Sequence, residues 1–203
     1  MKKLISIIAA GIVCLMLTAC NSENNSSNGD KFAGLELISV EADRITFSDL
    51  DALEKACDIA VVGYFTDEPK QEVSYVQFAD GGKGVNNIMA TCPIKITEVL
   101  KGSVEAGDSV NVLQNSGVVN DQLLVFDELT PIQKGDEWMF FLSRSEEHDG
   151  YWICGCADGR YPTKNSTARN SKMSLSDSWQ LGVVDRANFN EKIYNEIVEK
   201  YDV

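Results

Sequence analysis

The chain has 203 residues, a net charge of −13 and a single histidine, and 44% of its residues are hydrophobic. This is enough apolar material for one globular domain. No cluster of Lys or Arg offsets the negative charge, so the composition argues against nucleic acid as a partner. An anionic membrane surface also repels such a chain, so the protein surface alone would not hold it on a membrane.

The N-terminal residues have the organisation of an export signal. Lys2 and Lys3 form a short basic region, and Leu4 to Leu17 is an uncharged apolar run that is too short to span a bilayer. Leu17-Thr18-Ala19-Cys20 then resembles a bacterial lipobox. The resemblance implies a lipoprotein signal peptide at residues 1–19 and a diacylglyceryl group on the sulfur of Cys20. The alternative is an ordinary signal peptide with a chance cysteine.

Lipidation of Cys20 would decide where the protein is found. Removal of Lys2 and Lys3 takes the net charge from −13 to −15. Two acyl chains, such as palmitate, bind a bilayer stably without help from the protein. We therefore expect a cell-membrane lipoprotein on the extracytoplasmic side, with residues 20–34 as a flexible tether, because Asn21 to Asp30 contains no apolar residue.

The domain is expected at residues 35–203, and its first elements are short. Leu35 to Val40 predicts a strand, and Ile45 to Phe47 predicts a second extended piece. Ser48 is typical of a helix N-cap, and the following Leu50, Leu53 and Cys57 fall on one stripe. The continuous apolar run Asp58 to Phe65 then indicates a strand that is covered on both faces.

The next segment is more polar. Val73 to Phe78 alternates weakly, as an edge strand would, and Gly81 to Gly84 contains a lysine among glycines. No Ser or Thr follows that lysine and no helical pattern follows the glycines, so a phosphate-binding loop is not indicated. We expect Gln71 to Asn87 to be a long polar loop, and loops of that length in a small domain are usually functional or disordered.

Two apolar strands should form most of the core. In the predicted strand Met89 to Lys101, Cys92 shares a face with two isoleucines before the pattern changes phase, which indicates a bulge near Thr97-Glu98. Trp138 to Leu142 is apolar on both faces. One of its faces can fill a barrel, whereas Met139 and Phe141 on the other face need a cover. Shorter strands are predicted at Val110 to Gln114 and Leu123 to Phe126.

The C-terminal third ends in an amphipathic helix. Asp149-Gly150 predicts the tip of a hairpin that returns through Tyr151 to Cys156. The hydrophobic residues of Thr163 to Trp179 show little periodicity, which predicts a second long connection. Asn188 is expected to cap a helix at 188–201, whose apolar residues repeat every four positions and could cover the outer face of the barrel. These apolar residues are Phe189, Ile193, Ile197 and Tyr201.

The order of these elements resembles a module of secreted bacterial lipoproteins that is similar to the netrin-like domain of tissue inhibitors of metalloproteinases. The resemblance covers residues 58 to 162. Its motifs are Asp58 to Gly63, Ile94 to Gly102, Gly107 to Val112, Lys134 to Leu142 and Gly159-Arg160-Tyr161. It implies a mostly β fold, an OB-like five-stranded barrel with a short N-terminal helix and a C-terminal amphipathic helix. The inhibitors' free N-terminal cysteine is not carried over, because Cys20 is the expected lipid site.

Four cysteines remain once Cys14 and Cys20 are set aside. Disulfides are permitted outside the cytoplasm, and Cys57, Cys92, Cys154 and Cys156 allow three pairings. The apolar phase of Cys57 and Cys92 favours core thiols instead. Cys154-Gly155-Cys156 has no second cysteine pair or suitable histidine beside it, so we expect no metal site and no cofactor.

The sequence contains no catalytic constellation. His148 lies in a charged turn with Glu146, Glu147 and Asp149, where a solvated cluster is the plain interpretation. We therefore expect a non-catalytic module that binds an extracytoplasmic protein or glycan through its loops or an open barrel face. The alternatives are an extracytoplasmic hydrolase with an acidic site, and a structural or accessory lipoprotein.

Overall fold

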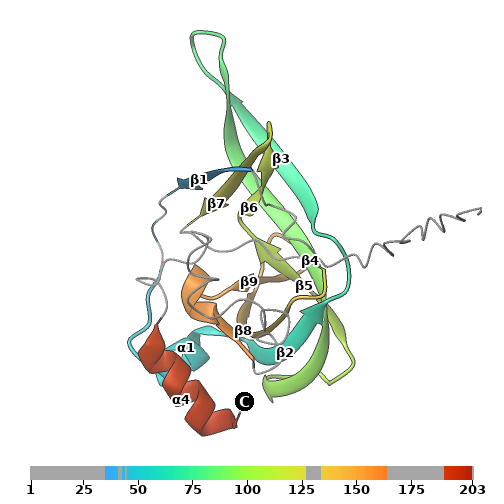
Figure 1. The fold of residues 1–203 in the computed structure, drawn as a ribbon, viewed down its shortest axis with the longest axis vertical. Coiled ribbons are helices and arrows are strands. Elements are labelled where there is room, and N and C mark those ends of the chain that lie inside the picture. The colour runs from blue at the N-terminus through green and yellow to red at the C-terminus, as the bar shows by residue number, and fades with distance from the viewer. Residues whose placement is uncertain (1–34, 41–42, 44, 127–133, 164–189, 203) are drawn as a thin grey trace, which may run out of the picture. The chain divides into compact units, whose positions relative to one another are not determined.

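The computed structural model describes residues 35–40, 43, 45–126, 134–163 and 190–202. Strands dominate this part of the chain, and two α-helices and one 3-10 turn accompany them (Figure 1). The fold is mostly β, as the sequence predicts. The elements in order are β1 (Glu36–Val40), α1 (Leu50–Ala56), β2 (Ile59–Phe65), β3 (Lys70–Gln77), β4 (Lys83–Lys101), β5 (Ser109–Gln114), β6 (Ser116–Val119), β7 (Gln122–Phe126), β8 (Glu137–Arg144), β9 (Tyr151–Ile153), η1 (Cys156–Gly159), β10 (Arg160–Pro162) and α4 (Glu191–Tyr201).

Five of the strands close into a barrel. The strand order is β8-β2-β4-β5-β9, and β9 pairs back onto β8. Only the contact between β5 and β9 is parallel, through Val112 opposite Tyr151 and Leu113 opposite Trp152. The other pairings around the barrel are antiparallel. A closed five-stranded barrel with this order is OB-like, which confirms the predicted fold class.

Alternate residues of the barrel strands fill its interior. Cys92, Ile94 and Ile96 of β4 point inward and are fully buried, as their common phase predicts. Phe140 of β8 meets Phe65 of β2 edge to face, with ring centroids 5.5 Å apart. Because side chains alternate across a strand, this filling leaves the other face of β8 to be covered from outside.

The two helices provide that cover. Met139 and Phe141 on the outer face of β8 pack with Ile193 and Ile197 of α4, and all four are fully buried. Tyr161 of β10 lies in the same cluster, 6.2 Å from Phe141 between ring centroids. The predicted role of the C-terminal helix as the cover of this face is therefore confirmed.

The described residues contain no helix that is long and apolar enough to cross a membrane.

Both helix starts differ by one or two residues from the sequence prediction. Asp49 caps α1, because its carboxylate accepts the N–H of Ala52, while the Ser48 hydroxyl donates to the Asp49 carboxylate. Asn190 caps α4 by accepting the N–H of Ile193. The predicted cap Asn188 lies outside the described residues, and the helix begins at Glu191 instead of residue 188. Neighbouring Ser, Asp and Asn residues are all good caps, so sequence alone does not choose between them.

The predicted bulge in β4 is present. Val62 of β2 pairs with Glu98 and Gly63 pairs with Ile96, so Thr97 has no partner on β2. Its hydroxyl donates to the carbonyl of Val62 over 3.2 Å. Such an extra residue bends a strand, which helps a small barrel to close.

A second, three-stranded sheet has the order β1-β7-β6, and two of its three strands were predicted. Strands at β1 and β7 are expected from the sequence, whereas β6 is not. Ile45 to Phe47, predicted as a short extended piece, is not part of any described strand. The predicted strand Tyr151 to Cys156 is also too long, since β9 ends at Ile153 and Gly155 takes a positive φ of 56° that turns the chain into η1.

A charged cluster joins α1 to α4. Glu54 of α1 accepts from Lys200 over 2.7 Å at both carboxylate oxygens and from the hydroxyl of Tyr201. Partial burial raises the pKa of Glu54, but the hydrogen bonds from Lys200 and Tyr201 outweigh it, so the pKa lies below its usual value. A carboxylate with a lowered pKa stabilises the fold above its unfolded pKa, and this contribution is lost as the pH falls through the folded value.

We expect Glu54→Gln to lower the free energy of unfolding by about 1 kcal/mol at pH 7. The effect is small because water screens the partly exposed ion pair between Glu54 and Lys200. The difference from the unsubstituted protein should shrink as the pH falls through the lowered pKa of Glu54, because the carboxylate then becomes protonated. Urea unfolding followed across this pH range measures it. A difference that stays constant with pH would show that the charge of Glu54 is not what stabilises the helix pair.

Candidate protein-binding surface

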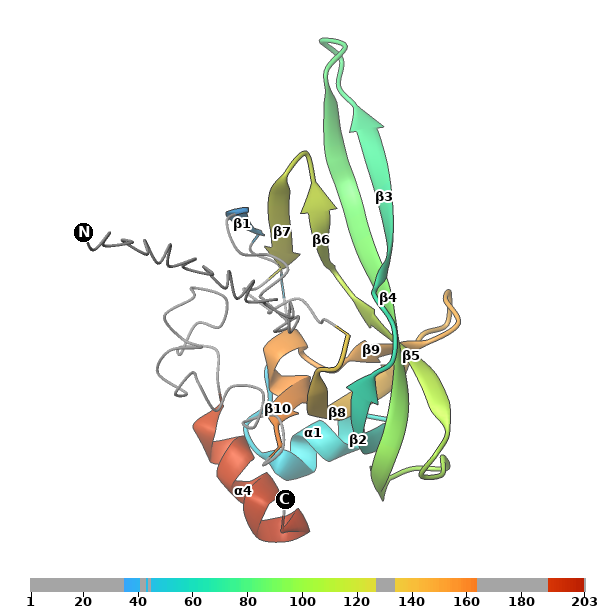
Figure 2. The same cartoon turned by 45° about the vertical axis from the view of Figure 1, so that its right-hand side comes forward.

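The strand β4 is much longer than the barrel requires. Its residues Ala90–Lys95 pair with β5 and Ile94–Lys101 pair with β2, whereas Lys83–Met89 pair with β3 alone. The β3–β4 hairpin therefore extends beyond the barrel, as Figure 2 shows. The prediction of a long loop from Gln71 to Asn87 is wrong. Cross-strand pairing orders most of this segment, and a turn is left only at its tip.

The tip is a tight and internally bonded turn. The N–H of Phe78 donates to the carbonyl of Gly82 over 2.8 Å, and the carboxylate of Asp80 accepts the N–H of Gly82 over 2.9 Å. Gly81 has a φ of 86°, a value that a side chain makes costly. Gly81 and Gly82, from the segment considered as a phosphate loop, therefore serve to reverse the chain.

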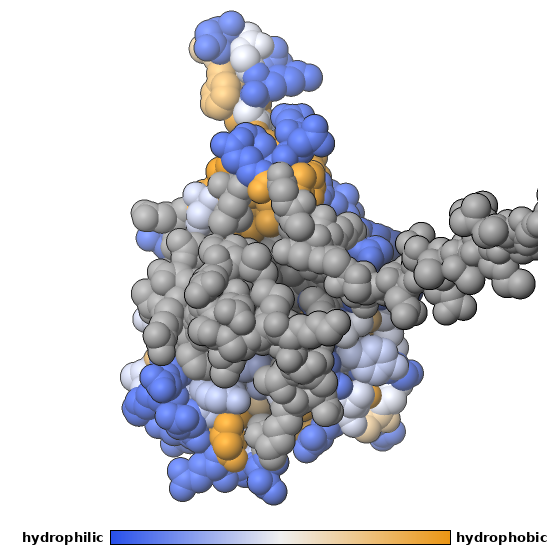
Figure 3. Space-filling view, in the orientation of Figure 1, coloured by the Kyte–Doolittle hydropathy of each residue, from blue (hydrophilic) through white to orange (hydrophobic). Residues whose placement is uncertain are grey.

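Apolar side chains lie exposed along the outer half of the hairpin. Tyr75 is 57% exposed, Phe78 is 53% exposed and Val76 is 39% exposed. Figure 3 shows hydrophobic colour above the barrel, interleaved with hydrophilic residues. Large apolar side chains that gather outside a core and are rimmed by polar groups typically mark an interaction site.

On one face of the hairpin, the ring of Phe78 packs over Gly84. A Cβ on Gly84 would lie 2.7 Å from the ring of Phe78 and 3.9 Å from Val76. The Phe78 ring therefore lies across the backbone of the neighbouring strand, with Val76 beside it. Tyr75 points to the opposite face, because successive side chains of a strand alternate. We call Val76, Phe78 and Gly84 the hairpin face.

The base of the hairpin is braced by β6. The side-chain amide of Gln71 donates to the carbonyl of Val118 over 2.8 Å and accepts its N–H over 2.7 Å. Gly117 has no Cβ, which lets β6 approach Ile88 and Gln71 closely. The hairpin is thus fixed to the second sheet at its base, while its outer half is left uncovered by the other described strands.

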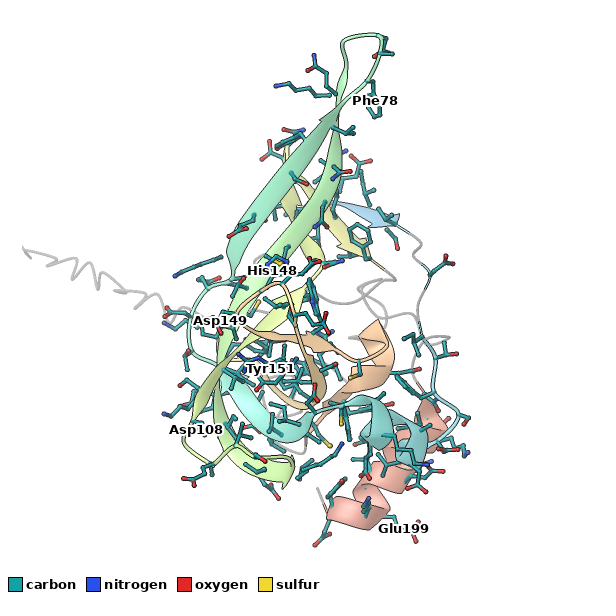
Figure 4. All side chains as sticks on the ribbon, turned by 180° about the vertical axis from the view of Figure 1, so that it is seen from behind. Phe78, Asp108, His148, Asp149, Tyr151 and Glu199 are labelled. Carbon is teal, nitrogen blue, oxygen red and sulfur yellow. The ribbon has the colours of Figure 1, made fainter. Side chains whose placement is uncertain are left out.

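His148 is not part of this surface. It is exposed in the turn between β8 and β9. Its backbone N–H donates to the Ser145 hydroxyl, and its ring meets that of Trp152 edge to face, with centroids 6.1 Å apart. Figure 4 shows His148 and Asp149 beside the barrel, well away from Phe78 near the hairpin tip. The described residues contain no group of three His, Cys, Asp or Glu side chains that could hold a metal ion.

The groove between α1 and α4 has a volume of about 600 Å³, and its charges are largely satisfied by protein groups. Glu196 accepts the N–H of Leu50 over 2.7 Å, and Lys192 donates to the carbonyl of Ser48 over 2.7 Å. These contacts fix the helices to each other.

The described thiols belong to the core. Cys57, Cys92 and Cys154 are buried and form no disulfide with one another. Burial raises the pKa of Cys92 and of Cys154 to about 12, so both stay protonated at neutral pH. The expectation that Cys57 and Cys92 are core thiols agrees with this burial. Cys154 also lies in the helix-covered cluster, which makes it a poor ligand for a surface metal.

Two expected features lie outside the described residues. They are the lipid site Cys20 with its tether, and the connection Thr163 to Trp179 apart from its first residue. Thr163 itself is buried and its hydroxyl hydrogen-bonds to Glu137 over 2.9 Å. No protein-family model matches the chain, and a search of curated proteins gives no match.

Proposed function

We propose that the chain is a lipid-anchored extracytoplasmic lipoprotein whose barrel presents the β3–β4 hairpin to a protein partner. The observation that carries the proposal is the exposure of Tyr75, Val76 and Phe78 on a hairpin that the barrel does not need for closure. The lipobox-like Leu17 to Cys20 supports the anchor, and the order of motifs over residues 58–162 supports kinship with the netrin-like modules of secreted lipoproteins.

The partner is a protein because of the chemistry of the hairpin. Aromatic and β-branched side chains on an ordered strand provide rigid apolar contact area, which is what protein interfaces favour at their centres. The net charge of −13 favours neutral or basic partners and argues against polyanions. Binding to a basic partner should weaken as salt rises.

A hydrolase is supported less well. Its active site would need titratable groups that converge in a pocket, and the groove between the helices holds charges that already bond to the protein. His148 lies in an exposed turn, and its hydrogen bond to the Ser145 hydroxyl is made by the backbone N–H and not by the imidazole. A purely structural lipoprotein gives no reason for exposing Val76 and Phe78.

Changing Val76 and Phe78 together to serine should remove the apolar hairpin face and lower recovery of the partner protein by about tenfold or more. The measurement is quantitative co-purification with the full lipid-anchored chain, solubilised gently from its own membranes. Ile45→Ser is the matched control, because Ile45 is also exposed and apolar but lies outside the hairpin.

Unchanged recovery in the double variant would contradict the proposal. A glycan that binds equally well to the double variant and to the unsubstituted chain would also overturn it, in favour of a surface elsewhere on the barrel. His148→Ala should leave recovery unchanged, and loss of function in that variant while it remains folded would favour an enzyme.

A further inference from the structure

A carboxylate lies beside the aromatic ring of the hairpin face. The Cβ that Gly82 lacks would lie 3.1 Å from Oδ1 of Asp80 and 3.6 Å from the ring of Phe78, so both side chains border the same position. Figure 4 shows Phe78 near the tip of the hairpin. The ring packs over Gly84 yet stays 53% exposed, so it offers an accessible aromatic surface next to the carboxylate.

The turn holds the carboxylate of Asp80 in place. Its Oδ1 accepts the N–H of Gly82 over 2.9 Å, which fixes the side chain against the backbone. The side chain is otherwise exposed, and no described lysine or arginine forms an ion pair with it. Asp80 is therefore an oriented anion that a group from outside can reach.

The charge of Asp80 is not balanced on its own side of the hairpin. The outer half of the hairpin, Tyr75 to Val85, contains two charged residues, Asp80 and Lys83. Lys83 pairs with Gln77, and paired residues point to the same side of a sheet. Because successive side chains alternate, Gln77 and Lys83 lie on the face opposite to Phe78.

A partner that covers Phe78 also removes water from Asp80, because the two side chains are neighbours. An unpaired charge is strongly disfavoured at such an interface, and pairing with a cation offsets the loss of water. The net charge of −13 also draws basic groups toward this chain. The tip of the hairpin is therefore complementary to a cationic group.

We propose that the partner protein places an arginine at the hairpin tip, with its guanidinium over the ring of Phe78 and its N–H groups on the carboxylate of Asp80. The inference rests on the proposed function and names the chemistry of its contact. Arginine fits better than lysine, because a planar guanidinium can stack on an aromatic face and donate to a carboxylate at the same time.

Asp80→Ser tests the charge. Serine keeps a hydroxyl that can accept the N–H of Gly82, so the turn is preserved while the charge is lost. We expect co-purification of the partner with the full lipid-anchored chain, solubilised from its own membranes, to fall about tenfold. Asp67→Ser is the matched control, because Asp67 is exposed in the connection between β2 and β3, and it should leave recovery unchanged. Equal recovery with the two variants would overturn the proposal.

Phe78→Leu tests the stacking, because leucine keeps an apolar side chain and removes only the aromatic face. Recovery in the same co-purification should fall about threefold through loss of the cation–π contact. Unchanged recovery would overturn the placement of the guanidinium over the ring.

Chemical modification of the partner tests the identity of the cation. A membrane extract from cells that lack this chain is treated with phenylglyoxal, which modifies arginine, or with an acetylating ester, which modifies lysine. Each extract is then added to the untreated full chain. The arginine reagent should lower recovery about tenfold with the unsubstituted chain and have little further effect with Asp80→Ser. An equal proportional loss with both forms of the chain, or a greater loss from the lysine reagent, would overturn the proposal.

The outcomes also separate this inference from the proposed function. If the Val76 and Phe78 double variant loses the partner while Asp80→Ser retains it, the protein partner stands and the arginine contact is wrong. If the double variant retains the partner, the proposed function itself is wrong.

Discussion

Phe141→Ala should destabilise the domain by about 3–5 kcal/mol. Phe141 is fully buried between the outer face of the barrel and the two helices, and its ring meets Tyr161 edge to face. Removing the ring leaves a cavity that β8 cannot fill, because β8 is held on one side by β2 and on the other by β9 and β10. Urea or heat unfolding of the detergent-solubilised protein measures the loss.

Phe78→Ala is the matched control, since it removes the same side chain from the exposed hairpin. Surface substitutions of this kind usually change stability by no more than about 0.5 kcal/mol. A loss below about 1 kcal/mol for Phe141→Ala would mean that α1 and α4 do not cover the barrel in solution. A large loss for Phe78→Ala would show that the hairpin face belongs to the folded core.

Cys20→Ala should abolish lipid attachment completely. The thioether needs the cysteine sulfur, and alanine offers no nucleophile for the diacylglyceryl group. Incorporation of labelled palmitate and the mass of the processed N-terminus are the measurements. Because a −15 chain is repelled by an anionic bilayer, the unlipidated protein should also lose its stable hold on the membrane once its signal is removed.

Cys14→Ala is the control for this change, because Cys14 lies within the apolar run of the signal and carries no expected lipid. Its labelling should equal that of the unsubstituted chain. Palmitate incorporation that persists in the Cys20→Ala variant, with the same processing, would contradict lipidation at Cys20 and favour an ordinary signal peptide.

The barrel could be predicted because apolar residues alternate along its strands. Cys92, Ile94 and Ile96 keep one phase until Thr97 interrupts it, and that interruption is the bulge seen in β4. Trp138 to Leu142 is apolar on both faces, which already calls for a filled barrel on one side and a cover on the other. The spacing of four residues between apolar positions such as Ile193 and Ile197 identified the helix that provides this cover.

The second sheet could not be read as easily, because its strands are short and their hydrophobic signal is weak. One local signal was available for β6. Asn120 and Asp121 both take positive φ, at 51° and 60°, and connect Val119 to Gln122 as a two-residue hairpin turn. Asparagine and aspartate tolerate that conformation better than most residues, so this pair between apolar runs favours a hairpin.

The sequence predicted an edge strand at Val73 to Phe78, which is present within β3 as far as Gln77, but it also predicted a long loop over Gln71 to Asn87, which is not. Gln71 to Asn87 is polar enough to suggest a loop, yet its pairing depends on β4 continuing past the barrel as far as Lys83. Tertiary context decides that continuation, since Gly117 and Gln71 brace the hairpin base against β6. The exposure of Phe78 likewise follows from the length of the hairpin, which composition does not specify.

Photo-crosslinking in intact cells, from a photoreactive phenylalanine analogue at position 78, is the most direct test for a partner protein at the hairpin face. We predict one predominant product that joins this chain to a different protein, with little product from the same analogue at position 45. A product of twice the chain mass would show self-association and would not support contact with a different protein. Equal, diffuse labelling from both positions would contradict a partner at the hairpin face.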